Sequence, residues 1–207
     1  MYNKFIKRWI DFIFALIGLI ILSPLFLLII IAIKLDSKGP VLFKQKRIGK
    51  DKALYEIYKF RTMKTNTPND APTHLLENPD FFITQVGKVL RKTSLDELPQ
   101  LINIIRGQMS IIGPRPALWN QYDLIAERDK YGANDIYPGL TGWAQINGRD
   151  ELPIQKKAQL DGIYTLKMSF FFDVKCFIGT IFSVLKTEGV VEGNTRNYKH
   201  TNSEEQI

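Results

Sequence analysis

The longest apolar segment of the chain covers residues 12–33, which are 22 positions without a charged side chain and with one polar interruption, Ser23-Pro24. A helix rises about 1.5 Å per residue, so this segment would reach roughly 33 Å, enough to cross the hydrocarbon core of a bilayer. Pro24 has no amide hydrogen and clashes with the carbonyl four residues earlier, while the Ser23 hydroxyl can bond to a carbonyl that the break exposes. The pattern predicts a membrane helix with a break near its middle.

Basic residues flank this segment on both sides: Lys4, Lys7 and Arg8 precede it, and Lys34 and Lys38 follow it. Such residues collect on the cytoplasmic side of membrane segments. Two positive flanks and a central break favour a re-entrant helix hairpin that enters and leaves on the cytoplasmic face. A straight span and a buried helix of a soluble protein remain alternatives. The segment is too long for a signal peptide, and no small-residue cleavage site follows it.

Beyond this segment, residues 41–63 alternate and are rich in β-branched and aromatic side chains, and Gly49-Lys50-Asp51 divides them. This pattern predicts a β-hairpin, and we expect one of its faces to carry Lys44, Lys46, Lys59 and Arg61. A short strand is expected at residues 109–112. Helices are expected at residues 81–91, 95–105, 119–130, 153–165 and 169–186.

The predicted fold is therefore α+β and mostly helical, with an N-terminal re-entrant membrane helix hairpin, a small β-hairpin and a helical cytoplasmic domain. The helix at residues 169–186 is strongly apolar but has too many polar residues to span a bilayer, so we expect it to lie as an amphipathic helix at the membrane interface. The expected division is a membrane anchor at residues 1–36, a cytoplasmic domain with the candidate catalytic residues at 37–187, and a polar tail at 188–207.

The chain has 207 residues and a net charge of +7, which is unevenly distributed. Residues 34–64 contain ten Lys or Arg and three acidic residues, so this segment accounts for the whole excess. A basic patch beside a membrane segment can bind anionic lipid, and some of its residues can bind a phosphorylated substrate. No nucleic-acid-binding motif accompanies the patch. The single cysteine, Cys176, excludes an internal disulfide and a multi-cysteine metal site.

Two adjacent acidic residues, Asp96-Glu97, open a predicted helix. The structural interpretation is a capping box, Ser94-x-x-Glu97, with acidic residues in the first helical turn. The functional interpretation uses the same position, because a helix N-terminus would keep Asp96 ionised and offer backbone amides to an anion. An ionised Asp can attack phosphorus, and a neighbouring Glu can hold Mg²⁺, which prefers carboxylate and phosphate oxygens.

Further candidates are basic residues suited to phosphate. Prolines on both sides of Arg115 restrict its backbone, so its guanidinium is presented with little freedom left to lose, although a rigid turn with a solvated Arg would look the same. Lys59, Arg61 and Arg91 are candidates for other phosphate contacts or are ordinary surface charges. The glycines of Gly142-x-x-Gln145-x-x-Gly148-Arg149 allow close backbone approach to a ligand.

Taken together, these residues resemble the bacterial sugar transferases, the monotopic polyprenol-phosphate phosphoglycosyl transferases. The resemblance extends in order from the apolar segment to about Phe182. Its motifs are Gly39-Pro40-Val41 with Gln45-x-Arg47-x-Gly49, Tyr58-Lys59-Phe60-Arg61-Thr62-Met63, Arg91-Lys92-Thr93-Ser94-Leu95-Asp96-Glu97-Leu98-Pro99-Gln100, Ser110-Ile111-Ile112-Gly113-Pro114-Arg115-Pro116 and Pro138-Gly139-Leu140-Thr141-Gly142-Trp143-Ala144-Gln145-Ile146-Asn147-Gly148-Arg149.

The resemblance implies transfer of a sugar 1-phosphate from a UDP-sugar to undecaprenyl phosphate, with release of UMP and dependence on Mg²⁺. Asp96 would be the nucleophile that carries a covalent phosphosugar, and Glu97 would support the metal. Ser23-Pro24 would be the break of a re-entrant helix. The remaining substrate contacts that it implies are Lys59, Arg61, Arg91, Arg115, Gln145, Arg149 and Asp161.

The implied location is the cytoplasmic face of the bacterial inner membrane, where a monotopic anchor would bring a soluble donor to a lipid acceptor. The first step of capsule, O-antigen, exopolysaccharide or glycoprotein synthesis is the expected setting, with the sugar left open. Pairing with a second copy through an apolar helix is also left open, and no nucleic acid partner is expected. The alternative function is a non-catalytic membrane-surface binding module that uses its basic patch.

Overall fold

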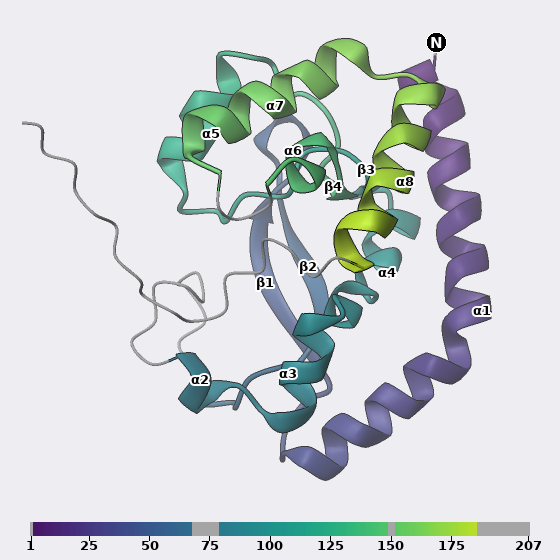
Figure 1. Ribbon diagram of the computed structural model, residues 1–207, viewed down its shortest axis with the longest axis vertical. Coiled ribbons are helices and arrows are strands. Elements are labelled where there is room, and N and C mark those ends of the chain that lie inside the picture. The colour runs from purple at the N-terminus through teal and green to yellow at the C-terminus, as the bar shows by residue number, and fades with distance from the viewer. Residues whose placement is uncertain (1, 68–78, 149–151, 186–207) are drawn as a thin grey trace, which may run out of the picture.

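The computed structural model describes residues 2–67, 79–148 and 152–185, and it shows a mostly helical α+β fold (Figure 1), which confirms the predicted fold class. Strands β1 and β2 pair antiparallel, and strands β3 and β4 pair in parallel. The strands are β1 (Leu42–Ile48), β2 (Leu54–Phe60), β3 (Ser110–Ile112) and β4 (Gly139–Thr141), and the helices are α1 (Lys7–Asp36), α2 (Pro79–Phe82), α3 (Gln85–Lys92), α4 (Gln100–Ile105), α5 (Tyr122–Asp129), α6 (Trp143–Ile146), α7 (Ile154–Lys167) and α8 (Phe170–Leu185).

Helix α1 is a continuous helix of 30 residues that bends near its middle, where Pro24 lies (Figure 1). Pro24 cannot donate to the carbonyl of Ile20, four residues earlier. The Ser23 hydroxyl donates to that carbonyl instead, at 2.8 Å. The expected local chemistry of Ser23-Pro24 is therefore present, but the two halves form one bent helix and not a hairpin of two helices.

Buried charged side chains fix the N-terminal end of α1 to the rest of the fold. Asp11 accepts hydrogen bonds from the Ser110 hydroxyl (2.6 Å) and the Ile111 amide (3.1 Å) of β3. Lys7 donates to Asp173 of α8 at 2.7 Å. Both α1 side chains are almost fully buried, so these partners are needed to offset the loss of hydration. They determine where α1 meets β3 and α8.

The other contacts of α1 lie farther along the helix. Ala15 packs in one apolar cluster with Leu101 of α4, and Ile33 lies in a second cluster near the end of β2. At the C-terminal end of α1, the Asp36 carboxylate accepts a hydrogen bond from the Val86 amide at the start of α3, at 3.1 Å. Helix α1 is therefore attached to the same folded body at both ends and in the middle.

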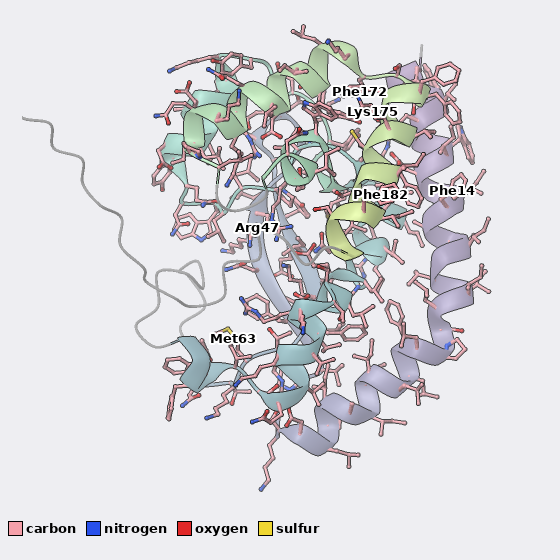
Figure 2. The ribbon with its side chains drawn as sticks, in the orientation of Figure 1. Phe14, Arg47, Met63, Phe172, Lys175 and Phe182 are labelled. Atoms are coloured by element: carbon pink, nitrogen blue, oxygen red, sulfur yellow. The ribbon has the colours of Figure 1, made fainter. Side chains whose placement is uncertain are left out.

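The sides of α1 and α8 that face away from this body are apolar. Phe14 of α1 and Phe182 of α8 are both 61% exposed (Figure 2). Helix α1 is long and apolar enough to cross a membrane by its length and composition. The interfacial position expected for α8 remains a prediction. Among the side chains of α8 that the structure describes, the other exposed apolar ones are Phe170, Phe171, Val174, Phe177, Ile178 and Ile181.

The predicted β-hairpin is confirmed, but the expected composition of its faces is wrong. The register pairs Phe43 with Lys59 and Lys44 with Tyr58. Because paired residues lie on the same face of a sheet and neighbours alternate, Lys44 and Lys46 project from the face opposite to Lys59. The residue of β1 that shares the face of Lys59 and contributes a positive charge is Arg47.

The free edge of β2 is closed by a side chain of α4. The Asn103 carboxamide accepts a hydrogen bond from the Tyr58 amide (3.0 Å) and donates to the Glu56 carbonyl (2.7 Å). These are the two backbone groups that a third strand would bind, so Asn103 substitutes for a strand. A further bond from Asn103 to Gln108 holds the carboxamide in this orientation.

Strand β4 is not among the strands that the sequence predicts. It passes so close to the end of β3 that a Cβ atom at Gly142 would lie 2.1 Å from the carbonyl oxygen of Gly113. Glycine is therefore required where this loop crosses the segment that leads to Arg115.

Three expected helices differ in their limits. The helix expected at residues 95–105 is divided into a 3₁₀ turn, Leu95–Glu97, and α4, Gln100–Ile105. The helix expected at residues 81–91 is divided into α2 and α3, because Thr84 has an extended backbone and its hydroxyl accepts a hydrogen bond from the Gly87 amide as an N-cap. The helix expected at residues 119–130 begins only at Tyr122. The expected polar tail at residues 188–207 lies outside the described residues, and the division at residues 36 and 187 stays a prediction.

Candidate active site

The acidic dyad lies in a short 3₁₀ turn, Leu95–Glu97, between α3 and α4. Ser94 before it has a left-handed backbone (φ +58°), and its side chain makes no capping hydrogen bond. The capping box is therefore not formed, and the structural explanation for Glu97 does not hold. The turn instead directs both carboxylates toward β2.

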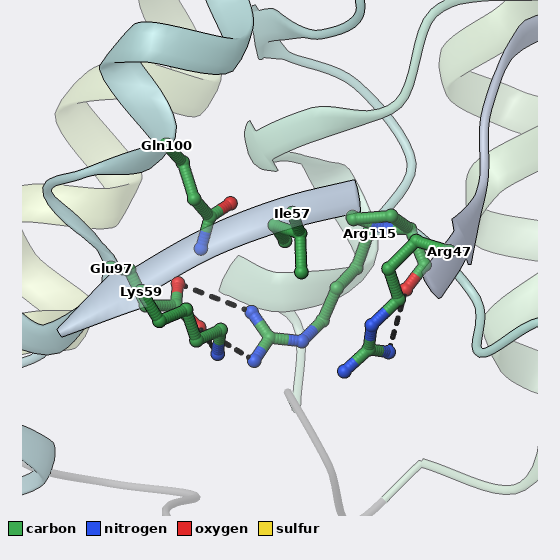
Figure 3. A pocket seen from close by; sticks show the side chains of 7 residues that line it. Arg47, Ile57, Lys59, Glu97, Gln100 and Arg115 are labelled. Carbon is green, nitrogen blue, oxygen red and sulfur yellow. Dashed lines mark hydrogen bonds and ion pairs between the residues drawn. The ribbon is translucent and has the colours of Figure 1, made fainter. Parts of the chain in front are cut away.

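Two cations from different segments meet the dyad. The Lys59 ammonium of β2 lies 2.7 Å from Glu97 Oε1 (Figure 3). It lies 3.9 Å from Asp96 Oδ2. Arg115 donates to both oxygens of Glu97, with Nη2 at 2.8 Å from Oε1 and Nη1 at 3.4 Å from Oε2. Residues separated by up to 56 positions thus form one cluster, in which two carboxylates share two cations.

The two carboxylates differ in their electrostatics. Burial raises the pKa of Asp96, and the charge of Lys59 only partly opposes this effect. Burial also acts to raise the pKa of Glu97, but the charges and hydrogen bonds of Arg115 and Lys59 outweigh it, so the pKa of Glu97 lies well below its ordinary value. The direction for Asp96 is opposite to the one expected from a helix N-terminus.

The cluster borders a small pocket of about 10 Å³, room for a single water molecule. Arg47 lies on its wall and holds the proline-rich segment in place, since it donates to the Pro116 carbonyl at 3.1 Å. Gln100, the first residue of α4, is another wall residue (Figure 3). The sequence places Arg47 and Gln100 within longer motifs but does not predict them as site residues. The correct hairpin register would have identified Arg47, because it shares the face of Lys59.

The remaining basic candidates have different positions. Arg91 lies in the last turn of α3, close enough for its charge to lower the pKa of Asp96. Arg61 is buried, and its guanidinium donates to the carbonyls of Ser37 and Lys38 in the turn after α1. Arg61 therefore fixes that turn through two backbone carbonyls. Arg61 is not among the residues that line the pocket.

Two further candidates, Asp161 and Gln145, are not among the residues that line the pocket. Asp161 of α7 is fully buried and accepts two hydrogen bonds from Arg128 of α5, at 2.6 and 2.8 Å. Both polar atoms of the Gln145 side chain are buried and have no hydrogen-bond partner among the described residues, as expected of a group that awaits a ligand. Arg149 lies outside the described residues.

The described residues contain no group of three or more His, Cys, Asp or Glu side chains that could hold a metal ion. A magnesium ion does not need one, since it is usually bound through one or two carboxylates together with substrate phosphates and water. Asp96 and Glu97 supply carboxylates of this kind. These two carboxylates therefore fit Mg²⁺ if substrate phosphate oxygens supply the other ligands. Glu97 would be available to the metal once the phosphates bind Lys59 and Arg115 in its place.

Comparison with known proteins gives a match over residues 2–187 to the family described as bacterial sugar transferase. The chain is 39% identical over 189 residues to an uncharacterized sugar transferase, EpsL, of Bacillus subtilis (strain 168), a match that covers 91% of this chain and 92% of that protein. It is 41% identical over 188 residues to the UDP-glucose:undecaprenyl-phosphate glucose-1-phosphate transferase of Escherichia coli (strain K12), covering 87% of this chain and 40% of that protein.

A third relative is the UDP-N-acetylgalactosamine-undecaprenyl-phosphate N-acetylgalactosaminephosphotransferase of Aeromonas hydrophila, which is 38% identical over 187 residues. The match covers 87% of this chain and 44% of that protein. The chain thus spans nearly all of the Bacillus relative and less than half of the other two. Since the family match includes every described residue, this chain is an enzyme that belongs to the bacterial sugar transferase family.

Proposed function

We propose that the chain transfers a sugar 1-phosphate from a UDP-sugar to undecaprenyl phosphate and releases UMP, through a covalent phosphosugar on Asp96. The observation that carries this proposal is the convergence of Lys59 and Arg115 on the Asp96-Glu97 dyad. The names of the Escherichia and Aeromonas relatives state undecaprenyl phosphate as a substrate together with a UDP-sugar, which supports the same reaction for this chain.

In the first step, an oxygen of the Asp96 carboxylate attacks the phosphorus that bears the sugar. The bond from this phosphorus to the bridging oxygen breaks, and UMP leaves with that oxygen and its electron pair. In the second step, a phosphate oxygen of undecaprenyl phosphate attacks the same phosphorus. The bond to Asp96 breaks and the carboxylate is restored, so that the enzyme ends as it began.

The cations of the cluster would change partners during this reaction. Without substrate, Lys59 and Arg115 neutralise Glu97. A diphosphate offers more negative charge than one carboxylate, and Arg binds phosphate oxygens bidentately. We infer that the diphosphate takes over Arg115 and Lys59 and that Arg91 adds a third positive charge. Gln145 and Arg149 remain proposed substrate contacts, and the unpartnered amide of Gln145 supports its inclusion.

Glu97, released from its cations, would hold Mg²⁺ together with phosphate oxygens. A bound Mg²⁺ supplies charge stabilisation to the phosphate oxygens during transfer. The chain itself presents two carboxylates, Asp96 and Glu97, at one turn. Their side chains are 13% and 15% exposed, so both are largely shielded from water.

We also propose that α1 is re-entrant and holds the enzyme on the cytoplasmic face of the bacterial inner membrane. Asp11 near one end bonds to β3 and Asp36 at the other end bonds to α3, so both ends of α1 adjoin one folded body. A straight span would place these ends on opposite sides of the bilayer. The bend at Pro24 and the basic residues at both ends support the same topology.

This topology has a direct test. Single cysteines at Phe5 and Lys38, both exposed, would be introduced after replacement of Cys176 by Ser, and whole cells would be treated with a membrane-impermeant maleimide. A re-entrant helix predicts no labelling at either position until the cells are opened. A straight span predicts labelling of one position in intact cells.

The reaction is tested by nucleotide release. The purified protein in nanodiscs, with Mg²⁺ and undecaprenyl phosphate, would be given UDP-sugars, beginning with UDP-glucose and UDP-N-acetylgalactosamine. Release of UMP with one donor supports the proposal and names the sugar. An Asp96→Asn variant should release no UMP, and after acid quench only the wild type should carry the phosphosugar. Release of UDP instead would mean ordinary glycosyl transfer and would refute the role of Asp96.

A further inference from the structure

Gln100 has an unusual environment for a polar side chain. It is 2% exposed and lines the pocket beside Lys59, Glu97 and Arg115. Figure 3 shows its carboxamide directed into this pocket. Within the described part of the chain, the side chain makes no hydrogen bond. Asn103, the other buried carboxamide of α4, makes three.

An amide that faces a small pocket without a protein partner contributes no hydrogen bond to the fold, whereas a leucine of similar size would fill the same space with apolar contact. The position therefore lacks a structural reason for glutamine. The pocket has room for about one water molecule, so the group that completes the hydrogen bonding of Gln100 is small: a water molecule, or a single oxygen atom of a ligand.

The position of Gln100 indicates which ligand atom this is. Gln100 follows Asp96 by four residues, and the chain between them continues in helical conformation through Leu98 and Pro99. Side chains four apart on a helix lie on the same face. The cations at the pocket attract oxyanions, and an amide group adds hydrogen-bond donors without a further charge.

We propose that the Gln100 carboxamide donates a hydrogen bond to a non-bridging oxygen of the phosphoryl group while that group is bound to Asp96. This inference rests on the proposed function, because it assumes phosphoryl transfer at Asp96. It assigns a further catalytic residue: Gln100 forms no covalent bond, and it stabilises the charge that develops on the phosphoryl oxygens.

The test is Gln100→Leu in full-length protein in nanodiscs, with Gln85→Leu as the matched control. Gln85 is also the first residue of a helix, but it is exposed on α3 and lies outside the pocket. We expect kcat for UMP release to fall about 10-fold to 100-fold in Gln100→Leu, with less than about a three-fold change in KM for the UDP-sugar. The control should keep kcat within about two-fold.

Thermal unfolding separates this role from a structural one. Because the Gln100 amide faces the pocket and has no protein partner within the described residues, its replacement by leucine should leave the melting temperature equal to that of the wild type or higher. Wild-type kcat in Gln100→Leu, or a melting temperature several degrees lower, would overturn the inference. If the wild type itself released no UMP, the proposed function would fail, and the melting temperature would still show whether the Gln100 amide has a partner within the protein.

Discussion

The role of Asp161 can be decided by experiment, because its two interpretations predict opposite results. Asp161 and Arg128 have side chains that are 1% and 4% exposed, and one carboxylate oxygen lies 2.6 Å from the guanidinium. Removing one partner of a buried ion pair costs about 3–5 kcal/mol, because the other charge stays buried without compensation. Asp161→Ala should therefore destabilise the protein by that amount if the pair is structural.

The expected change in melting temperature follows from the size of the chain. A domain of 150–250 residues loses about 2–4 °C for each kcal/mol, so Asp161→Ala should unfold about 6–20 °C lower than the wild type. The double variant Asp161→Leu with Arg128→Met replaces both charges by apolar groups and should recover most of this loss. Lys52→Ala removes one partner of an exposed ion pair with Asp129 and should change stability by at most about 1 kcal/mol.

The assay is thermal unfolding of all variants in the same nanodiscs, together with UMP release at a temperature well below every transition. A structural pair predicts that the double variant keeps kcat and KM near the wild-type values. Near wild-type stability of Asp161→Ala together with loss of activity would refute this reasoning. That result would instead support Asp161 as a contact to substrate, as the family resemblance implies.

Other predictions concern the cluster, the hairpin and α1. Lys59→Met should raise the pKa at which kcat/KM falls on the acid side of its pH profile, since the Lys59 charge lowers the pKa of Asp96. An unchanged pKa in that profile would contradict this prediction. Asn103→Leu should cost about 2–4 kcal/mol in urea unfolding, because it leaves backbone groups of β2 unpaired. Burial raises the pKa of Cys176 to about 12, so this thiol should react with maleimide only after unfolding. Asp11→Leu should lower the melting temperature, since β3 loses two hydrogen bonds. It should also lower kcat, since the chain after β3 carries Arg115.

The elements that could be predicted from the sequence are those determined by local chemistry. The bend of α1 near Pro24 follows from the missing amide hydrogen of proline, and the hydroxyl of Ser23 bonds as expected. The β-hairpin and the helices near residues 153–165 and 169–186 follow from alternation and apolar periodicity. Each of these signals lies within a few residues of the structure that it determines.

The hairpin face shows where local reasoning fails. Its register depends on the connection after Gly49, where Asp51 and Lys52 both have left-handed backbones with φ of 53° and 61°. A connection one residue longer or shorter would reverse which side chains share a face. The sequence does not reveal such a conformation for non-glycine residues, so Lys44 and Lys46 were placed with Lys59 when the structure places Arg47 there.

The candidate site was predictable as a set of residue types but not as a set of contacts. Asp96, Glu97, Lys59 and Arg115 were all selected for their chemistry, and the structure brings them together. Arg61 was selected for the same reason, yet its guanidinium binds two backbone carbonyls. A charged side chain has the same appearance in a sequence whether its partner is a ligand or a carbonyl of the protein itself.

The contacts of α1 imply that this helix helps to position the candidate active site and is more than a tether. A tether could leave its polar residues in water, whereas Lys7 and Asp11 are buried against α8 and β3. The chain after β3 carries Arg115, and the chain after α3, which Asp36 contacts, carries the dyad. Two of the segments that form the cluster are therefore positioned from opposite ends of α1. A change in the bend at Pro24 would alter the distance between those ends, and with it the separation of Arg115 from Glu97.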